Sequence, residues 1–168
     1  MNVKFLNPFV EAAKDVLKAE LNTDVQRGDL SLEKSAMTTN EITVIISLVE
    51  QVQGVVLYSM TTQTGLNIIS KMMNQEFTEI DDLAESGIGE LANVISGRAT
   101  VLLSESGFQT NISPPTLVRG ENISISTLDF DRIIVPLKTD LGTITVHLAL
   151  RESSPGAQDS NFVNVSLP

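Results

Sequence analysis

The chain has 168 residues, of which 42% are hydrophobic, and this suits one globular domain with a substantial core. Its net charge is −10 and it has no basic cluster, so nucleic acid and an anionic membrane surface are poor partners. The absence of cysteine excludes disulfides and thiolate-based catalytic or zinc sites. No stretch approaches the roughly 20 apolar residues of a membrane span, nor does the start resemble a signal peptide, so we expect a cytoplasmic protein.

The first part of the chain is predicted to form a helix, a hairpin and a second helix. Asn7-Pro8 has the pattern of a helix start, and apolar residues then recur at helical spacing to about Leu21. Alternating apolar residues predict a hairpin over Glu41–Met60, with its turn at Gln51–Gly54. Helical spacing returns over Thr62–Asn74.

The stretch Ala84–Leu103 is predicted to lie in a long amphipathic helix. Thr78, with Asp81 three residues later, resembles a capping box, and Ser106-Gly107 is a suitable end. A helix of about 27 residues between these signals would span roughly 40 Å. One apolar stripe would face the core, formed by Ala84, Ile88, Leu91, Ile95, Ala99 and Leu102.

Strands dominate the remainder of the chain. Phe108–Ser113 is predicted as a strand ended by Pro114-Pro115, and Ile123–Leu128 as another. A second hairpin is predicted from Arg132–Lys138 and Thr143–Leu150. This order favours an α+β fold, a two-layer α/β sandwich with a mostly antiparallel sheet and a long central helix. We assign residues 1–152 to one domain and 153–168 to a polar C-terminal tail, whose Phe162, Val163, Val165 and Leu167 are candidates to dock.

Few residues fit the common catalytic constellations. The single histidine, His147, is predicted on the face of its strand opposite the apolar stripe, where an ordinary strand or interface residue is the favoured interpretation. Asp129, Asp131 and Asp140 are better explained as loop acids than as metal ligands. No nucleotide-binding loop, zinc-protease or calcium-loop pattern occurs, so we predict no metal site in this chain.

The polar side of the long helix is the strongest candidate site. Ser86, Glu90, Asn93 and Gly97 fall on one face, with Glu90 and Asn93 as surface neighbours. The plain alternative is a solvated helix face. Against it, interior glycines each cost about 1 kcal/mol relative to alanine, and asparagine is a poor helix former. Local helix propensity is overridden here, which is typical of functional positions.

This pattern resembles the signature of the CheC/CheX/FliY family, bacterial phosphatases of phosphorylated response regulators. The resemblance rests on Ser86-x3-Glu90-x2-Asn93, on its continuation to Gly97, and on Pro114-Pro115, which follow slightly earlier than in the family pattern. Either proline could be the family's, and we assign Pro115 to the supporting residues. CheC-like members carry two copies of the helix motif. The single copy here resembles CheX members, which form homodimers.

The resemblance implies a role for each residue of the motif. Asn93 would hold the water that attacks an aspartyl phosphate on a CheY-type receiver domain, in chemotaxis or another two-component pathway. Glu90 would bind the receiver's lysine, and Ser86 would add a peripheral hydrogen bond. Gly97 and Gly89 would let the two backbones approach. The Mg²⁺ is expected on the receiver, with no cofactor bound by this chain.

Two alternatives stay open. One is a non-catalytic module of the same fold that binds a receiver without hydrolysis. The other is an unrelated scaffold or oligomerisation domain, in which the glycines serve helix packing alone. The scaffold alternative predicts that Glu90 and Asn93 are buried or apart rather than exposed together.

Overall fold

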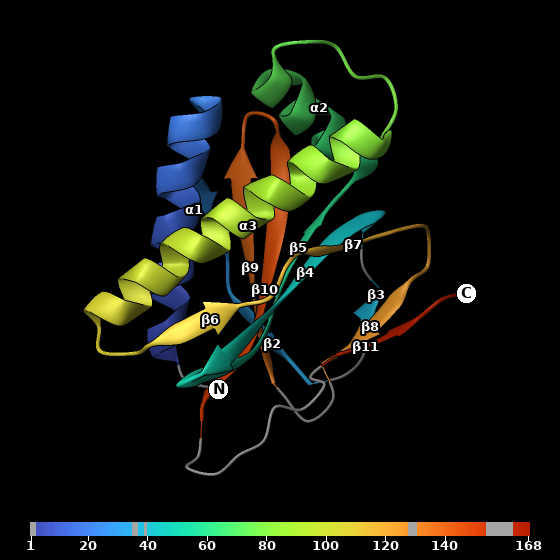
Figure 1. Cartoon of the computed structure of the whole chain (residues 1–168). Helices are drawn as coiled ribbons and strands as arrows, with labels where there is room; N and C mark the ends of the chain where they lie inside the picture. Colours follow the sequence, from blue (N-terminus) through green and yellow to red (C-terminus); the bar gives the residue numbers. More distant parts are fainter. Residues whose placement is uncertain (1–2, 35–36, 39, 128–130, 154–162) are drawn as a thin grey trace.

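A single antiparallel sheet forms the centre of the molecule (Figure 1). The computed structural model describes residues 3–34, 37–38, 40–127, 131–153 and 163–168. Two long hairpins make the middle of the sheet, and short strands extend both edges, in the order β1-β9-β10-β5-β4-β6 with β2 also on β9 and β7 also on β4. The strands are β1 Gln26–Arg27, β2 Ser31–Glu33, β4 Ile42–Glu50, β5 Val52–Met60, β6 Thr110–Ile112, β7 Thr116–Arg119, β9 Arg132–Thr139 and β10 Gly142–Glu152.

Three helices cover one face of this sheet, with α3 crossing it diagonally (Figure 1). They are α1 Leu6–Leu21, preceded by a 3₁₀ turn Val3–Phe5, α2 Thr62–Met73 and α3 Asp82–Glu105. The main core lies between these helices and the alternate residues of the four long strands. On β4, for example, Ile42, Val44, Ile46 and Leu48 are all fully buried. The alternation of apolar residues therefore predicted correctly which face of β4 points into the core.

A small second sheet packs on the opposite face of the central strands. It has the order β11-β8-β3, from β3 Met37–Thr38, β8 Ser124–Ser126 and β11 Asn164–Ser166. Ile123 and Ile125 pack there against a second apolar cluster from β4, β5 and β10, together with Val163 and Val165. The α+β fold with a mostly antiparallel sheet is confirmed, and the structure adds this partial third layer. Of the tail residues named as candidates to dock, Val163 and Val165 do so, Leu167 is 72% exposed, and Phe162 lies outside the described residues.

Four local predictions were wrong. Helix α1 begins at Leu6, with Phe5 at its N-cap, and not at Asn7-Pro8. The first hairpin reverses at Glu50-Gln51, where Glu50 has φ +85°, and Gly54 lies within β5. Asp81, not Thr78, caps α3, which has 24 residues, about three fewer than predicted. Strand β7, which directly follows Pro115, was not predicted at all.

Candidate functional site

Helix α3 carries the predicted site and is well defined at both ends. The Asp81 side chain accepts a hydrogen bond of 2.8 Å from the backbone N–H of Ala84, which satisfies one of the free donors of the first turn. The helix ends at Glu105 with Ser106 as its C-cap, and Gly107 follows with φ +91°, in agreement with the predicted end at Ser106-Gly107. The predicted apolar stripe is buried except for Leu102, which is half-buried.

Polar contacts fix α3 against its neighbours. The Tyr58 hydroxyl on β5 lies 2.8 Å from the Ser96 hydroxyl in the core, and burial raises the pKa of Tyr58 more than this bond lowers it. Arg119 on β7 pairs with Glu85 at 2.9 Å and donates to the carbonyl of Ile80 at 2.7 Å. These contacts fix the position of the helix backbone, on which the side chains of the outer face are placed.

The outer face of α3 presents the predicted residues together. Ser86 and Glu90 are exposed, and Asn93 and Gly97 are half-buried. The side chains of Ser86, Glu90 and Asn93 make no hydrogen bond or ion pair with any residue that the structure describes. An amide and a carboxylate are thus available to a partner, which is the arrangement that the unrelated-scaffold alternative does not predict.

A second row on the same face is aliphatic. Leu83, Val94 and Val101 are 51%, 37% and 48% exposed. At about 100° per residue they lie beside Glu90, on the side away from Asn93. The face therefore combines polar and apolar groups, which is typical of an interaction surface rather than a solvated helix face.

The glycines of α3 have different surroundings. A Cβ on Gly87 would lie 2.2 Å from Cδ1 of Ile69, so this glycine allows α2 and α3 to pack. A Cβ on Gly89 would lie 3.7 Å from Cγ of Pro115, within the same chain. A Cβ on Gly97 would meet no heavy atom within 4 Å. Of the two glycines expected to give clearance, Gly97 faces open space and Gly89 faces this chain's own proline.

The structure separates the two candidate prolines. Pro115 is half-buried and lies within 4 Å of a Cβ built on Gly89. Gly89 directly precedes Glu90 in the helix. Pro114 is exposed. Because Pro115 packs against the helix beside Glu90, it supports the backbone on which the site is built. This contact joins residues that the sequence could connect only through the family pattern.

The other candidates of the sequence form no site. His147 is 3% exposed, its Nδ1 has no hydrogen-bond partner, and burial and the nearby positive charge of Arg132 lower its pKa to about 4. Asp131 and Asp140 lie at opposite ends of β9, and Asp129 lies outside the described residues. Within the described part of the chain, no three His, Cys, Asp or Glu side chains gather to hold a metal ion.

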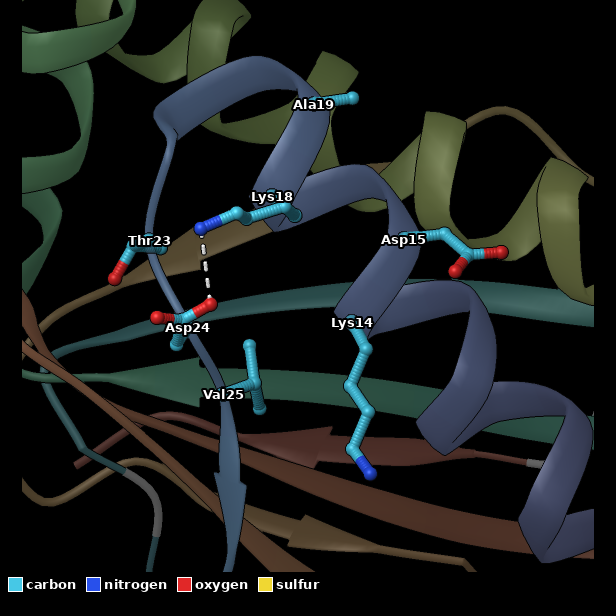
Figure 2. A pocket seen from close by; sticks show the side chains of 7 residues that line it. All are labelled: Lys14, Asp15, Lys18, Ala19, Thr23, Asp24 and Val25. Carbon is cyan, nitrogen blue, oxygen red and sulfur yellow. Dashed lines mark hydrogen bonds and ion pairs between the residues drawn. The ribbon is translucent and has the colours of Figure 1, made fainter.

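A wide hollow on the outer side of α1 is separate from the α3 face. It has a volume of about 630 Å³ and is lined by Lys14, Asp15, Lys18, Ala19, Thr23, Asp24 and Val25. Figure 2 shows that its lysines extend on one side of the helix and that Lys18 is held by Asp24, at 3.0 Å. No α3 residue lines it, so it does not contribute to the Glu90–Asn93 face.

The chemistry available on α3 needs a second surface. A carboxamide can orient a water molecule through its oxygen and its NH₂ group, but it is neither a base nor a nucleophile near neutral pH. A carboxylate can bind a cation. These two groups on an exposed helix can complete a reaction whose reactive bond lies on another molecule.

Comparison with known proteins shows the family to which the fold belongs. The family model for chemotaxis phosphatase CheX matches residues 42–138, which is more than half of the chain. The chain belongs to the CheX family. The matched segment runs from β4 to β9 and includes all of α3.

Individual CheX relatives extend the match over most of the chain. The CheY-P phosphatase CheX of Thermotoga maritima is 27% identical over 128 residues, covering 76% of this chain and 83% of that protein. A CheC-like superfamily protein from Shewanella sp. PV-4 has a TM-score of 0.81 and 29% identity, covering 90% and 99% of the two chains. The structure of a CheX–CheY–BeF₃–Mg²⁺ complex from Borrelia burgdorferi has a TM-score of 0.76 and 28% identity, covering 90% and 100%.

No helix among the residues described is both long and apolar enough to cross a membrane. The long helix α3 carries charged and polar residues along its outer face, as described above.

Proposed function

We propose that this chain is a phosphatase that accelerates hydrolysis of the aspartyl phosphate on a CheY-like receiver domain. The observation that carries the proposal is that the exposed Glu90 and the half-buried Asn93 lie side by side, without partners among the described residues, on the long helix of a CheX-family fold. The relative from Thermotoga maritima is a CheY-P phosphatase, and a CheX from Borrelia burgdorferi forms a complex with CheY.

In this proposal the reaction is an in-line displacement by water. The water oxygen bonds to phosphorus as the bond to the aspartyl oxygen breaks, which yields inorganic phosphate and a free carboxylate. The receiver supplies the Mg²⁺ that neutralises the phosphoryl oxygens, so this chain needs no cofactor of its own. What a receiver alone lacks is a group that holds the attacking water in line.

Asn93 is proposed to be that group. Its amide has no partner within the described residues, so it is free to accept a hydrogen bond from the water and orient it. Glu90 is proposed to bind the receiver's lysine near the phosphorylation site and so to set the register of docking. Ser86 lies one turn before Glu90, where it can add a hydrogen bond at the edge of the contact.

Gly97, Gly89 and Pro115 are proposed to shape the surface. Gly97 leaves open space one turn beyond Asn93, which lets a receiver backbone come close. The Pro115 ring packs against Gly89 and so fixes the position of the α3 backbone next to Glu90. We also propose a homodimer in the cytoplasm, on the basis of the similarity to CheX members.

The alternative is a receiver-binding module without hydrolysis. It makes the same contacts through Glu90 and does not require an amide at position 93. The rate of receiver dephosphorylation therefore distinguishes the two functions, when a variant without the Asn93 amide is compared with a variant that lacks an asparagine elsewhere.

The test measures dephosphorylation of a phosphorylated CheY-type receiver from the same organism. Asn93→Ala is expected to lower the acceleration by on the order of 100-fold while keeping the affinity for the receiver, because the water loses its orienting group. The control is Asn7→Ala, which removes an exposed asparagine from α1. No acceleration by the wild-type protein would exclude the phosphatase function, and equal rates for both variants would exclude the role of Asn93.

A further inference from the structure

A hollow lies beside Glu90 where the three helices meet. It has a volume of about 180 Å³ and is lined by Glu20 of α1, Met72 of α2, and Glu90, Leu91 and Val94 of α3. Leu91 is buried, Met72 is half-buried, and Val94 is 37% exposed. The hollow thus has apolar walls and opens on the same surface as the proposed site.

Two carboxylates stand at this hollow. Glu20 and Glu90 are both exposed, and neither makes an ion pair or side-chain hydrogen bond with a residue that the structure describes. Among the cations of these helices, Lys18 pairs with Asp24 at 3.0 Å and Arg98 with Asp15 at 3.2 Å. Lys71, which precedes Met72, interacts electrostatically with Asp140. The hollow therefore presents two carboxylates that have no ion-pair partner among the described residues, beside an apolar wall.

These features define the chemistry of an occupant. Lysine and arginine side chains pack their aliphatic stems on apolar surface while the charged head reaches polar groups. A stem lying on Met72 and Val94 would bring its head between the Glu20 and Glu90 carboxylates. A purely apolar side chain would leave both charges without a partner, and an acidic one would be repelled.

We propose that this hollow receives one lysine or arginine side chain of the receiver, with Glu20 as a second carboxylate that determines the specificity of docking. The inference rests on the proposed function for the identity of the partner. Glu90 belongs both to the hollow and to the proposed site, so a receiver seated on the site also covers the hollow. Glu20 acts on binding and lies outside the chemistry that Asn93 performs.

The experiment measures the dissociation constant of the full-length protein for a receiver loaded with beryllofluoride and Mg²⁺, a stable mimic of the phosphorylated state. Glu20→Gln is expected to raise the dissociation constant about threefold, and Glu20→Lys about tenfold or more. The control is Glu11→Gln, which is exposed on the same helix. Nine residues before Glu20, it lies on the opposite side of α1 at about 100° per residue, and it should bind as the wild type does.

Kinetics separate the inference from the proposed function. With phosphorylated receiver, Glu20→Gln is expected to raise KM and leave kcat unchanged, whereas Asn93→Ala lowers kcat. If the wild type binds the loaded receiver but does not accelerate hydrolysis, the proposed phosphatase function fails while the binding comparison still tests the hollow. If Glu20→Gln and Glu11→Gln bind equally well, the hollow is not a docking pocket. If the wild type does not bind, both proposals are wrong.

A charge reversal identifies the occupant. Each exposed lysine and arginine around the receiver's phosphorylation site is replaced by glutamate. The dissociation constant of each receiver variant is then measured for Glu20→Lys and for the wild-type protein. One receiver variant is expected to bind Glu20→Lys more tightly than it binds the wild type, because the reversed pair restores attraction. If every receiver variant binds Glu20→Lys more weakly than the wild type, no basic side chain of the receiver occupies the hollow.

Discussion

Gly97 is the glycine of α3 that packing within the described structure does not explain. It lies one turn beyond Asn93, and a Cβ there would meet no described heavy atom within 4 Å apart from its chain neighbours and the nearby backbone of its own helix. Glycine in a helix interior is less stable than alanine by about 1 kcal/mol, since the glycine backbone loses more freedom on folding. No close contact that requires a glycine at this position occurs among the residues that the structure describes. A receiver backbone lying on this part of the helix would account for it.

Gly97→Ala is therefore expected to change stability and activity in opposite directions. The free energy of unfolding should rise by about 0.5–1 kcal/mol, measured by urea denaturation, because helix propensity improves without a clash. The acceleration of receiver dephosphorylation should fall, because the methyl group occupies the clearance. A Gly97→Ala protein with the activity of the wild type would show that no partner approaches this position closely.

Gly54 provides a control for the effect of a Gly→Ala substitution on stability, because its surroundings leave no space for a Cβ. It has φ +136°, and a Cβ there would lie 1.9 Å from the carbonyl oxygen of Ala149 on β10. Gly54→Ala is thus expected to destabilise the protein, whereas Gly97→Ala stabilises it.

At the scale of the element, the start of α3 depends on one cap. Asp81 accepts from the backbone N–H of Ala84, and its carboxylate also lies at the positive end of the helix dipole. Thr78, which the sequence pattern suggested as a cap, is exposed and lies outside the helix. The first turn of α3 also carries the Glu85–Arg119 pair, so its order influences how β7 and Pro115 meet the helix.

Asp81→Ala is expected to lower the free energy of unfolding by about 1 kcal/mol, because the cap hydrogen bond and the charge at the helix end are both lost. Thr78→Ala should leave it unchanged. Chemical denaturation of the two variants beside the wild type measures both effects. If the two substitutions have equal effects, the cap assignment is wrong.

Residues of the site that lie in one helix could be predicted from the sequence, whereas residues contributed by other helices could not. Ser86, Glu90, Asn93 and Gly97 could be placed on one face because they lie in one helix, whose period is fixed by backbone geometry. The contributions of Glu20 and Met72 to the hollow could not be predicted, since they come from other helices and meet Glu90 only through packing. The sequence holds no local signal for such contacts.

The strand errors have a similar origin. Gly54 suggested a turn because glycine commonly adopts positive φ in turns, yet here its missing side chain admits the backbone of β10. The turn itself uses Glu50 at φ +85°, a conformation that non-glycine residues rarely adopt. Strand β7 has only four residues and pairs with β4 alone, so its formation depends on the neighbour more than on its own pattern.

At the scale of the whole molecule, the central sheet has two unlike faces. The helix-covered face packs apolar side chains almost throughout, with Tyr58 and Ser96 paired inside it. The face towards the small sheet contains His147, which is buried beside the positive charge of Arg132. Its Nδ1 has no hydrogen-bond partner. A proton on this imidazole would be buried near another cation, so the neutral form is strongly favoured in the folded state.

This predicts that acid destabilises the fold through His147. Burial first, and Arg132 second, lower its pKa from 6.5 to about 4, so between these values the unfolded chain binds a proton that the folded chain does not. Stability from this group is complete above pH 6.5 and is lost as the pH falls towards 4, by on the order of 3 kcal/mol. His147→Leu should flatten the pH dependence of the unfolding free energy over this window, measured by urea denaturation at successive pH values. All carboxylates are common to both proteins, so the difference between the two curves isolates the imidazole. Parallel curves would mean that the pKa of His147 is the same in the folded and the unfolded chain, which would contradict the prediction.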